Sequence, residues 1–180
     1  DAGVTRLSLG VQSFNDTLLQ RIGRIHNGRQ AHDALETAYR LFDKVNLDIM
    51  FALPNQTMEQ LQHDVQTALS YNPTHVSYYH LTLEPNTYFH RYPPTLPDDD
   101  LALDMQAYIE AELENAGMKH YEVSAFAKAG HESVHNTNYW QFGDYIGTGA
   151  GAHGKISAHD GIMRYSKFKH PQTYLTEIAN

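Results

Sequence analysis

Cysteine is absent from the 180 residues of this chain. Without thiols, these residues can form no disulfide, no thiolate metal site and no cysteine-ligated iron–sulfur cluster. The absence of disulfides is compatible with the cytosol. We therefore expect a cytoplasmic location, with peripheral attachment to a membrane as the alternative.

Long apolar runs are also missing. No stretch approaches the roughly 20 apolar residues that a membrane-spanning helix needs, so we expect no transmembrane segment. The first residues, DAGVTRLSLG, lack the basic leader and apolar core of a signal peptide. They are typical of the middle of a domain, and the last residues, TYLTEIAN, are typical of an interrupted helix, so we expect a segment of a longer protein.

Basic residues are few, with 13 Lys and Arg against 21 Asp and Glu, and the net charge is −8. A nucleic-acid surface needs clustered basic side chains, but here no basic run exceeds two residues. We therefore exclude nucleic acid as a partner. Hydrophobic residues make up 41% and charged residues 19% of the chain, which predicts a globular fold with a core of its own.

Alternating apolar and polar residues predict strands at 5–12, 45–52, 74–83 and 119–125. Helical spacing and capping signals predict helices between them: a short one capped by Asn15 or Asp16, one at 29–42, one opened by a Thr57–Gln60 capping box, and one from Asp99 to a left-handed Gly117. This alternation predicts an α/β fold with a parallel sheet.

Two stretches depart from the alternation. Residues 84–97 are rich in proline and too long for an ordinary connection, which indicates an excursion or a lid. The segment KISAHDGIMRYSK predicts a hairpin that turns at Asp160 and Gly161.

Polar residues stand late in each predicted strand: Gln12, Asp48, His80 and Ser124. The carboxyl ends of parallel strands meet at one edge of a sheet, so we expect one shared pocket. Asp48 lies between apolar neighbours and could hold a ribose diol or a cation, the alternative being a solvated carboxylate on an edge strand. Gln12 offers donors and acceptors, and Arg24 offers a planar fork for a carboxylate, although a structural glutamine and a solvated arginine are equally ordinary.

The segment HNTNYWQFGDYIGTGAGAHG, residues 135–154, holds the single tryptophan, Trp140, beside Tyr139, and it has four glycines in its last eight residues. Such glycines allow a close approach to a flat ligand, a charged cofactor or a neighbouring strand, or they form a tight turn. A neutral His135 could ligate a metal or heme iron. A hydrogen-bonded structural histidine is the alternative, as it is for His80 and His153. HxxxH and HExxH patterns are absent, so we expect no preformed zinc site.

Five segments in order resemble one family: GVTRLSLGVQSF, NLDIMFALPNQT, HVSYYHLTLEPNT, HNTNYW and DYIGTGAGAHG. The series is similar to the radical S-adenosylmethionine (SAM) proteins of the oxygen-independent coproporphyrinogen III oxidase group. The HNxxYW box points to its branch of heme chaperones. The resemblance implies a partial parallel (β/α)6 barrel of the radical SAM type, with residues 1–154 as its C-terminal part. Residues 155–180 would be an appended hairpin and a helix leading to a further C-terminal module.

The resemblance also implies cofactors. Family members hold a [4Fe–4S] cluster through the cysteines of a CxxxCxxC motif, and SAM binds to the open iron. That motif is not among these residues, so we expect the segment alone to bind no cluster and to be inactive.

Site residues follow from the same resemblance. Gln12 would contact SAM, Arg24 would pair with its methionyl carboxylate, and Asp48 would hold its ribose. The remaining implied positions are His80 and His153 on the adenine side, and His135, Tyr139 and Trp140 at heme, with His135 as the iron ligand.

Three functions remain open at this stage. The first is a chaperone that binds heme or another porphyrin and transfers it to acceptor proteins. The second is an oxidase that decarboxylates coproporphyrinogen III to protoporphyrinogen IX in heme biosynthesis. The third is an α/β scaffold without a ligand. In each case the open edge of a half barrel predicts a homodimer or marginal stability.

Overall fold

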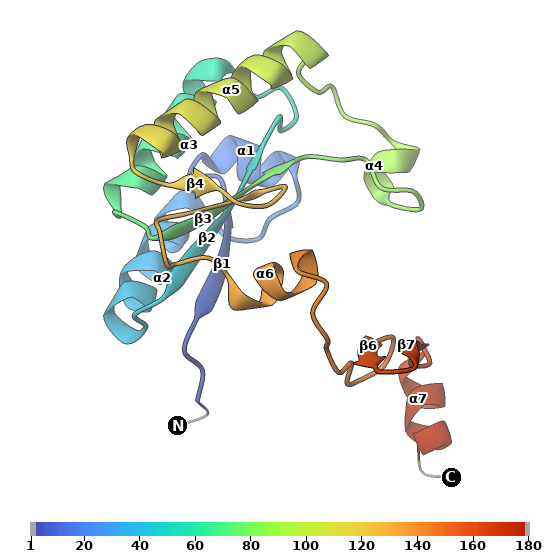
Figure 1. The fold of residues 1–180 in the computed structure, drawn as a ribbon. Helices are drawn as coiled ribbons and strands as arrows, with labels where there is room; N and C mark the ends of the chain where they lie inside the picture. Colours follow the sequence, from blue (N-terminus) through green and yellow to red (C-terminus); the bar gives the residue numbers. More distant parts are fainter. Residues whose placement is uncertain (1–2, 179–180) are drawn as a thin grey trace. The chain divides into compact units, whose positions relative to one another are not determined.

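The computed structural model describes residues 3–178, which form two compact units (Figure 1). The first unit runs to Glu132 and the second begins at Ser133. This division by contacts lies earlier in the chain than the domain boundary expected after residue 154. That boundary concerned the barrel of the family, and it stays a prediction.

The first unit is built on a five-stranded sheet with the order β1-β2-β3-β5-β4. Its first three strands are parallel and confirm the strands predicted at 5–12, 45–52 and 74–83. The strands are β1 (Leu7–Gln12), β2 (Val45–Phe51), β3 (His75–His80), β4 (Lys119–His120) and β5 (Ala125–Ala127).

Helices of the first unit begin and end where the capping signals predicted. Asn15 caps the first helix, Thr57 and Gln60 form a capping box, and Gly117 takes a left-handed φ of 78° after the last. The helices are α1 (Asp16–Arg21), α2 (Gly28–Leu41), α3 (Met58–Ser70), α4 (Tyr88–Arg91) and α5 (Asp99–Asn115). The short α4 lies inside the predicted excursion.

The prediction of a fourth parallel strand at 119–125 is wrong. The segment instead reverses, and β4 and β5 run antiparallel to one another, with β5 antiparallel to β3. The Glu122 carboxylate accepts hydrogen bonds from the N–H and Oγ of Ser124, at 3.3 and 3.2 Å. These local bonds hold a turn that competes with an extended strand.

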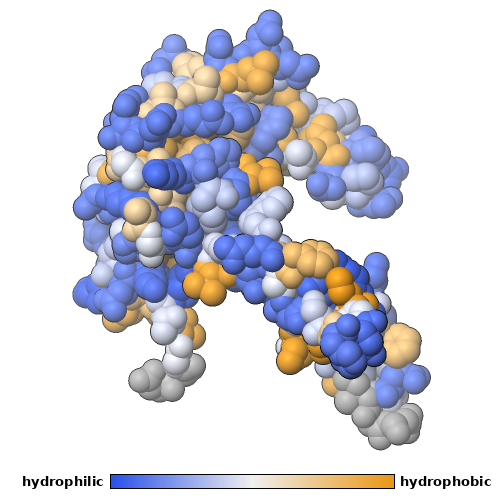
Figure 2. Space-filling view, in the orientation of Figure 1, coloured by the Kyte–Doolittle hydropathy of each residue, from blue (hydrophilic) through white to orange (hydrophobic). Residues whose placement is uncertain are grey.

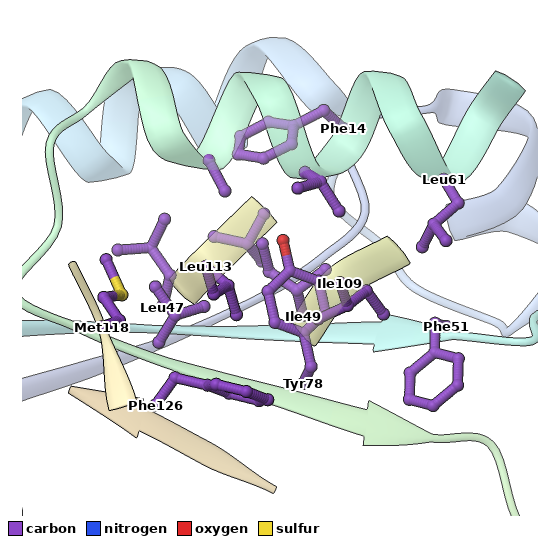
Figure 3. Close-up of a cluster of buried hydrophobic side chains, with 14 of the residues drawn as sticks. Phe14, Leu47, Ile49, Phe51, Leu61, Tyr78, Ile109, Leu113, Met118 and Phe126 are labelled. Atoms are coloured by element: carbon purple, nitrogen blue, oxygen red, sulfur yellow. The ribbon is translucent and has the colours of Figure 1, made fainter. Parts of the chain in front are cut away.

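The core lies on one face of the sheet. Alternate residues of β2, such as Leu47 and Ile49, are fully buried against Leu35 of α2, Val65 of α3 and Ile109 of α5. Figure 3 shows Leu47, Ile49 and Tyr78 pointing from the strands toward the helices drawn above them. Because strand side chains alternate, the intervening residues of β2 and β3 lie on the opposite face, and except for Met50 these are polar.

The second unit contains the predicted hairpin. Strands β6 (His153–Ala158) and β7 (Gly161–Ser166) pair antiparallel, with Ala158 opposite Gly161. The helices α6 (Val134–Trp140) and α7 (Pro171–Ile178) flank the hairpin in the chain. Lys155 of β6 is buried, and its Nζ donates to Asp144 Oδ1 and Phe142 O, both at 2.8 Å, and to Ser157 Oγ at 2.9 Å.

Figure 2 shows hydrophilic residues over most of the visible face, with smaller hydrophobic patches between them. Within residues 3–178, no helix has both the length and the apolar character that crossing a bilayer requires.

Candidate functional site

Asp48 is the centre of a polar cluster on the face of the sheet opposite the helices. Its Oδ2 accepts a hydrogen bond from Ser8 Oγ at 2.8 Å, and its Oδ1 accepts one from Asn46 Nδ2 at 2.7 Å. Asn46 Nδ2 also donates to Ser8 Oγ at 2.7 Å. Both carboxylate oxygens are thus held by donors. Each oxygen keeps a further lone pair, so Asp48 can accept additional hydrogen bonds from a ligand.

His75 of β3 supports this cluster from one side. Its Nδ1 lies 2.5 Å from Asn46 Oδ1, and its Nε2 lies 2.7 Å from the Tyr121 hydroxyl. Burial, with a smaller contribution from the charge of Arg6, lowers the pKa of His75 to about 3, so the imidazole is neutral near pH 7. Asn46 Oδ1 can only accept, so Nδ1 carries the proton and Tyr121 donates to Nε2.

Gln12 lies next to Asp48. It ends β1 at a β-bulge with a φ of 67°, a left-handed conformation that costs a non-glycine residue about 1–2 kcal/mol. A Cβ on Gly10 would come within 2.7 Å of Gln12 Nε2, so the carboxamide lies over Gly10, and Gly10 pairs in register with Asp48. Gln12 is only 8% exposed, and its carboxamide has no hydrogen-bond partner within residues 3–178. The structure therefore places an unused amide beside the carboxylate.

Arg24 is not joined to these two residues. It lies exposed in the loop after α1, where its backbone N–H donates to Leu19 O at 2.9 Å. Its guanidinium forms no ion pair with any residue of the described chain.

His80 and Ser124 line a pocket away from the Asp48 cluster. The His80 ring packs against Phe51, with centroids 5.1 Å apart, and Phe51 faces the helices. Together with Phe126, they line a pocket of about 370 Å³ beside α5. Ser124 reaches this edge through the antiparallel β5 rather than a parallel strand. The four strand-end residues expected to share one pocket are thus divided between the two faces of the sheet.

In the second unit, α6 presents His135 and Tyr139 one helical turn apart. Their rings meet edge to face with centroids 4.7 Å apart, and Tyr139 meets Tyr145 in the same way at 4.6 Å. Trp140 is 61% exposed and Phe142 is 56% exposed. An exposed imidazole therefore stands at one end of an aromatic surface.

The glycines that follow have different roles. A Cβ on Gly147 would come within 2.1 Å of the carbonyl oxygen of His153, and one on Gly154 would meet the Tyr165 ring at the same distance. The close approach predicted at these two glycines is thus to the neighbouring strands. His153 itself begins β6 with an exposed side chain.

Sequence reasoning missed the residues that hold Asp48, namely Ser8, Asn46, His75 and Tyr121. A polar residue two positions before Asp48 was the available signal, because residues i and i+2 of a strand share a face. It also missed the carboxylate of Asp144, whose pKa the Lys155 ammonium and the Ser157 donors lower to about 2.

Comparisons with known proteins found similar sequences and a similar fold. The family model of the radical SAM superfamily matches residues 1–68, which include Gln12 and Asp48. The chain is 50% identical over 176 residues to a protein of Haemophilus influenzae and 48% identical over 176 residues to one of Escherichia coli, both named heme chaperone HemW. It is 43% identical over 160 residues to the bovine radical S-adenosyl methionine domain-containing protein 1, mitochondrial.

These alignments cover 97% of this chain for the two bacterial relatives and 86% for the bovine one. The chain spans about half the length of the bacterial relatives, 46% and 47%, and 36% of the bovine one.

A solved structure has the same fold. Coproporphyrinogen III oxidase (HemN) from Escherichia coli, described as a radical SAM enzyme, superposes with a TM-score of 0.80 at 20% identity. The match covers 98% of this chain and 44% of that one. The predicted α/β fold with parallel strands of the radical SAM type is confirmed.

Proposed function

The chain belongs to the heme chaperone branch of the radical SAM superfamily, and from this premise we propose that the protein binds heme and transfers it to acceptor proteins. Its relatives at 50% and 48% identity are named heme chaperones. We propose the same role for this protein, together with acceptor proteins and a homodimeric state.

The aromatic surface of α6 is the observation that carries the heme site. His135 is exposed, and its ring edge meets Tyr139, which in turn meets Tyr145. A neutral imidazole nitrogen is a common ligand of heme iron. The neighbouring exposed rings of Trp140 and Phe142 can cover a flat apolar macrocycle, and burial of such aromatic area contributes strongly to binding.

Heme titration of the full-length protein, followed by Soret absorbance, tests this role. We expect His135→Ala to shift the Soret band and to weaken heme binding about tenfold, equivalent to about 1.4 kcal/mol. His159→Ala is the matched control, because His159 is a fully exposed histidine of the same unit, on the β6–β7 turn. An unchanged spectrum and affinity in His135→Ala would remove His135 from iron ligation.

The radical SAM fold implies that the whole protein also binds SAM and a [4Fe–4S] cluster. The residues of the first unit fit the adenosyl group of SAM. Asp48 has lone pairs free for a ribose diol, Gln12 has an unpartnered amide, and Gly10 leaves room between them. Arg24 would pair with the methionyl carboxylate. His80 packs against Phe51 on the other face of the sheet, so it does not join this group. In this superfamily the bound cofactor supplies radical chemistry.

Oxidative decarboxylation of coproporphyrinogen III has weaker support. The likeness to that oxidase, at 20% identity, concerns the fold. The named chaperones are 48% and 50% identical. An anaerobic assay of the intact, cluster-loaded protein that yields protoporphyrinogen would favour the oxidase instead.

A further inference from the structure

Asn46 uses every hydrogen-bonding position of its amide. Its Nδ2 donates to Ser8 Oγ and to Asp48 Oδ1, both at 2.7 Å. Its Oδ1 accepts from His75 Nδ1 at 2.5 Å and, more weakly, from Ser77 Oγ at 3.4 Å. Both donor hydrogens and both acceptor lone pairs of the amide are therefore used, so its neighbours determine its orientation.

Asp48 fixes which end of the amide faces it, because a carboxylate only accepts and would repel the amide oxygen. The oxygen therefore faces His75, whose Nδ1 carries the proton and donates to it at 2.5 Å. His75 Nε2 is then an acceptor, and the Tyr121 hydroxyl donates to it at 2.7 Å. His75 thus holds the amide in this orientation. The order Tyr121, His75, Asn46, Asp48 is therefore a chain of hydrogen bonds donated in one direction.

The chain of bonds crosses the sheet. Ser8 comes from β1, Asn46 and Asp48 from β2, His75 from β3, and Tyr121 from the turn after β4. Asn46 and His75 pair in register and are each 3% exposed. A side chain held by three strands and a turn loses little further freedom when a ligand binds, and this preorganisation increases affinity.

From this geometry we propose that Asn46, oriented by His75, is a positioning residue that sets the Asp48 carboxylate to receive the vicinal hydroxyls of the ribose of an adenosyl ligand. The inference rests on the proposed SAM site and adds residues that hold its carboxylate. Both Asp48 oxygens meet donors on the protein side, so the group is a pure acceptor toward the ligand. Gln12 provides the neighbouring amide.

The test measures affinity in the full-length, cluster-loaded protein by isothermal titration calorimetry. The two probes are S-adenosylhomocysteine, which carries the ribose diol, and its 2′,3′-dideoxy analogue. We expect Asn46→Ala to weaken binding of the first probe about tenfold and to leave binding of the second unchanged. In an Asp48→Asn background the same change should add no further loss, because two residues acting through one contact are not additive.

Further variants keep the test decisive if Asn46→Ala fails to fold. His75→Asn retains a donor toward Asn46 and should keep wild-type affinity for the diol probe, whereas His75→Leu should bind this probe about tenfold more weakly. Ser8→Ala removes a single exposed donor and should weaken binding by less than tenfold. Ser70→Ala is the matched control, because the Ser70 hydroxyl donates only within its own helix, to Thr67 O at 2.7 Å.

Two results would overturn the inference in distinguishable ways. Equal weakening of both probes in Asn46→Ala and His75→Leu would mean that these residues act on the fold and not on the diol contact. If the wild-type protein binds the two probes equally well, Asp48 does not recognise ribose at all. The proposed SAM contact then fails together with the inference, while the heme titration remains an independent test of the chaperone function.

Discussion

Asp64 of α3 is a carboxylate buried where the chain leaves β1. It accepts hydrogen bonds from Ser13 Oγ at 2.7 Å and from the Phe14 N–H at 2.8 Å. Burial raises its pKa from 3.8 to about 6, although those two bonds and the charge of His63 act in the opposite direction. Asp64 therefore anchors the loop that follows Gln12 and titrates close to neutral pH.

The pH dependence of stability should reveal this group. The native carboxyl binds its proton more tightly than the unfolded one, so its contribution to stability falls as pH rises from about 4 to about 6. The oxygen of Asn can still accept from the Phe14 N–H, its NH2 can donate to Ser13 Oγ in the reverse direction, and it does not titrate. As pH rises through that window, the free energy of unfolding of Asp64→Asn should increase by about 3 kcal/mol relative to that of wild type, at 1.36 kcal/mol per pKa unit.

Urea denaturation between pH 4 and pH 7 measures this difference. Asp64→Ala is the comparison, because it leaves the buried Phe14 N–H unpaired and should be about 1–3 kcal/mol less stable than Asp64→Asn at every pH. If wild type and Asp64→Asn gave parallel curves, Asp64 would not titrate in this range.

Single residues could be chosen from the sequence only where the signal was local. Asp48 stood out as a charge between apolar neighbours, and the structure places Gln12 beside it. Asn46 and His75 lie 29 positions apart in the chain, and their contact depends on β2 pairing with β3 in register. Asp64 reads as an ordinary helix residue because its burial depends on the loop after β1.

Helices and strands were also predictable only where the signal was local in the sequence. Helix starts were predicted correctly because a cap such as Asn15 or Thr57 bonds to the backbone three residues away. The reversal between β4 and β5 was missed, because polar–apolar alternation alone does not say where an extended segment turns back. The free edge of β3 accepts an antiparallel strand as readily as a parallel one.

The β6–β7 hairpin depends on a close approach at Gly154. A Cβ there would come within 2.1 Å of the Tyr165 ring, whose hydroxyl accepts from the Gly147 N–H at 3.0 Å. We expect Gly154→Ala to destabilise the second unit by about 1–3 kcal/mol, the usual cost of overpacking. Thermal unfolding followed by Trp140 fluorescence measures the loss.

A second substitution checks the cause of that loss. Leucine at position 165 lacks the distal ring atoms that the added methyl would strike. The double variant Gly154→Ala, Tyr165→Leu should therefore be more stable than the sum of the two single changes predicts. Simple additivity would mean that the steric contact with Tyr165 is not the reason.

At the scale of the whole molecule, the chain divides into two units, each with its own hydrogen-bonded sheet. The first unit holds the large core beneath α2, α3 and α5, whereas the second relies on the hairpin and the buried Lys155. Units of such different cores need not unfold together.

We expect two denaturation transitions. Trp140 is the only tryptophan and reports the second unit, whereas far-UV circular dichroism is dominated by the long helices of the first. The fluorescence midpoint should come at a lower urea concentration than the circular dichroism midpoint. Coincident midpoints for the two signals would contradict independent unfolding.

The fold class was predictable at this scale, because alternating strands and helices favour a parallel α/β sheet and the ordered motifs resemble one superfamily. The extent of the sheet and the boundary between the two units at Ser133 were not predictable from the sequence. Both depend on contacts between distant segments, which no local pattern encodes. The homodimer expected from the open sheet edge stays a prediction.

The burial of Lys155 has a practical consequence for handling the protein. Amine-reactive linkers, used to fix proteins on biosensor chips, attack accessible lysines. The Lys155 amine is shielded by Asp144, Ser157 and the Phe142 carbonyl. Random amine coupling would therefore leave this hairpin chemically intact, and the α6 surface that follows Ser133 could be presented to heme on a chip without a dedicated tag.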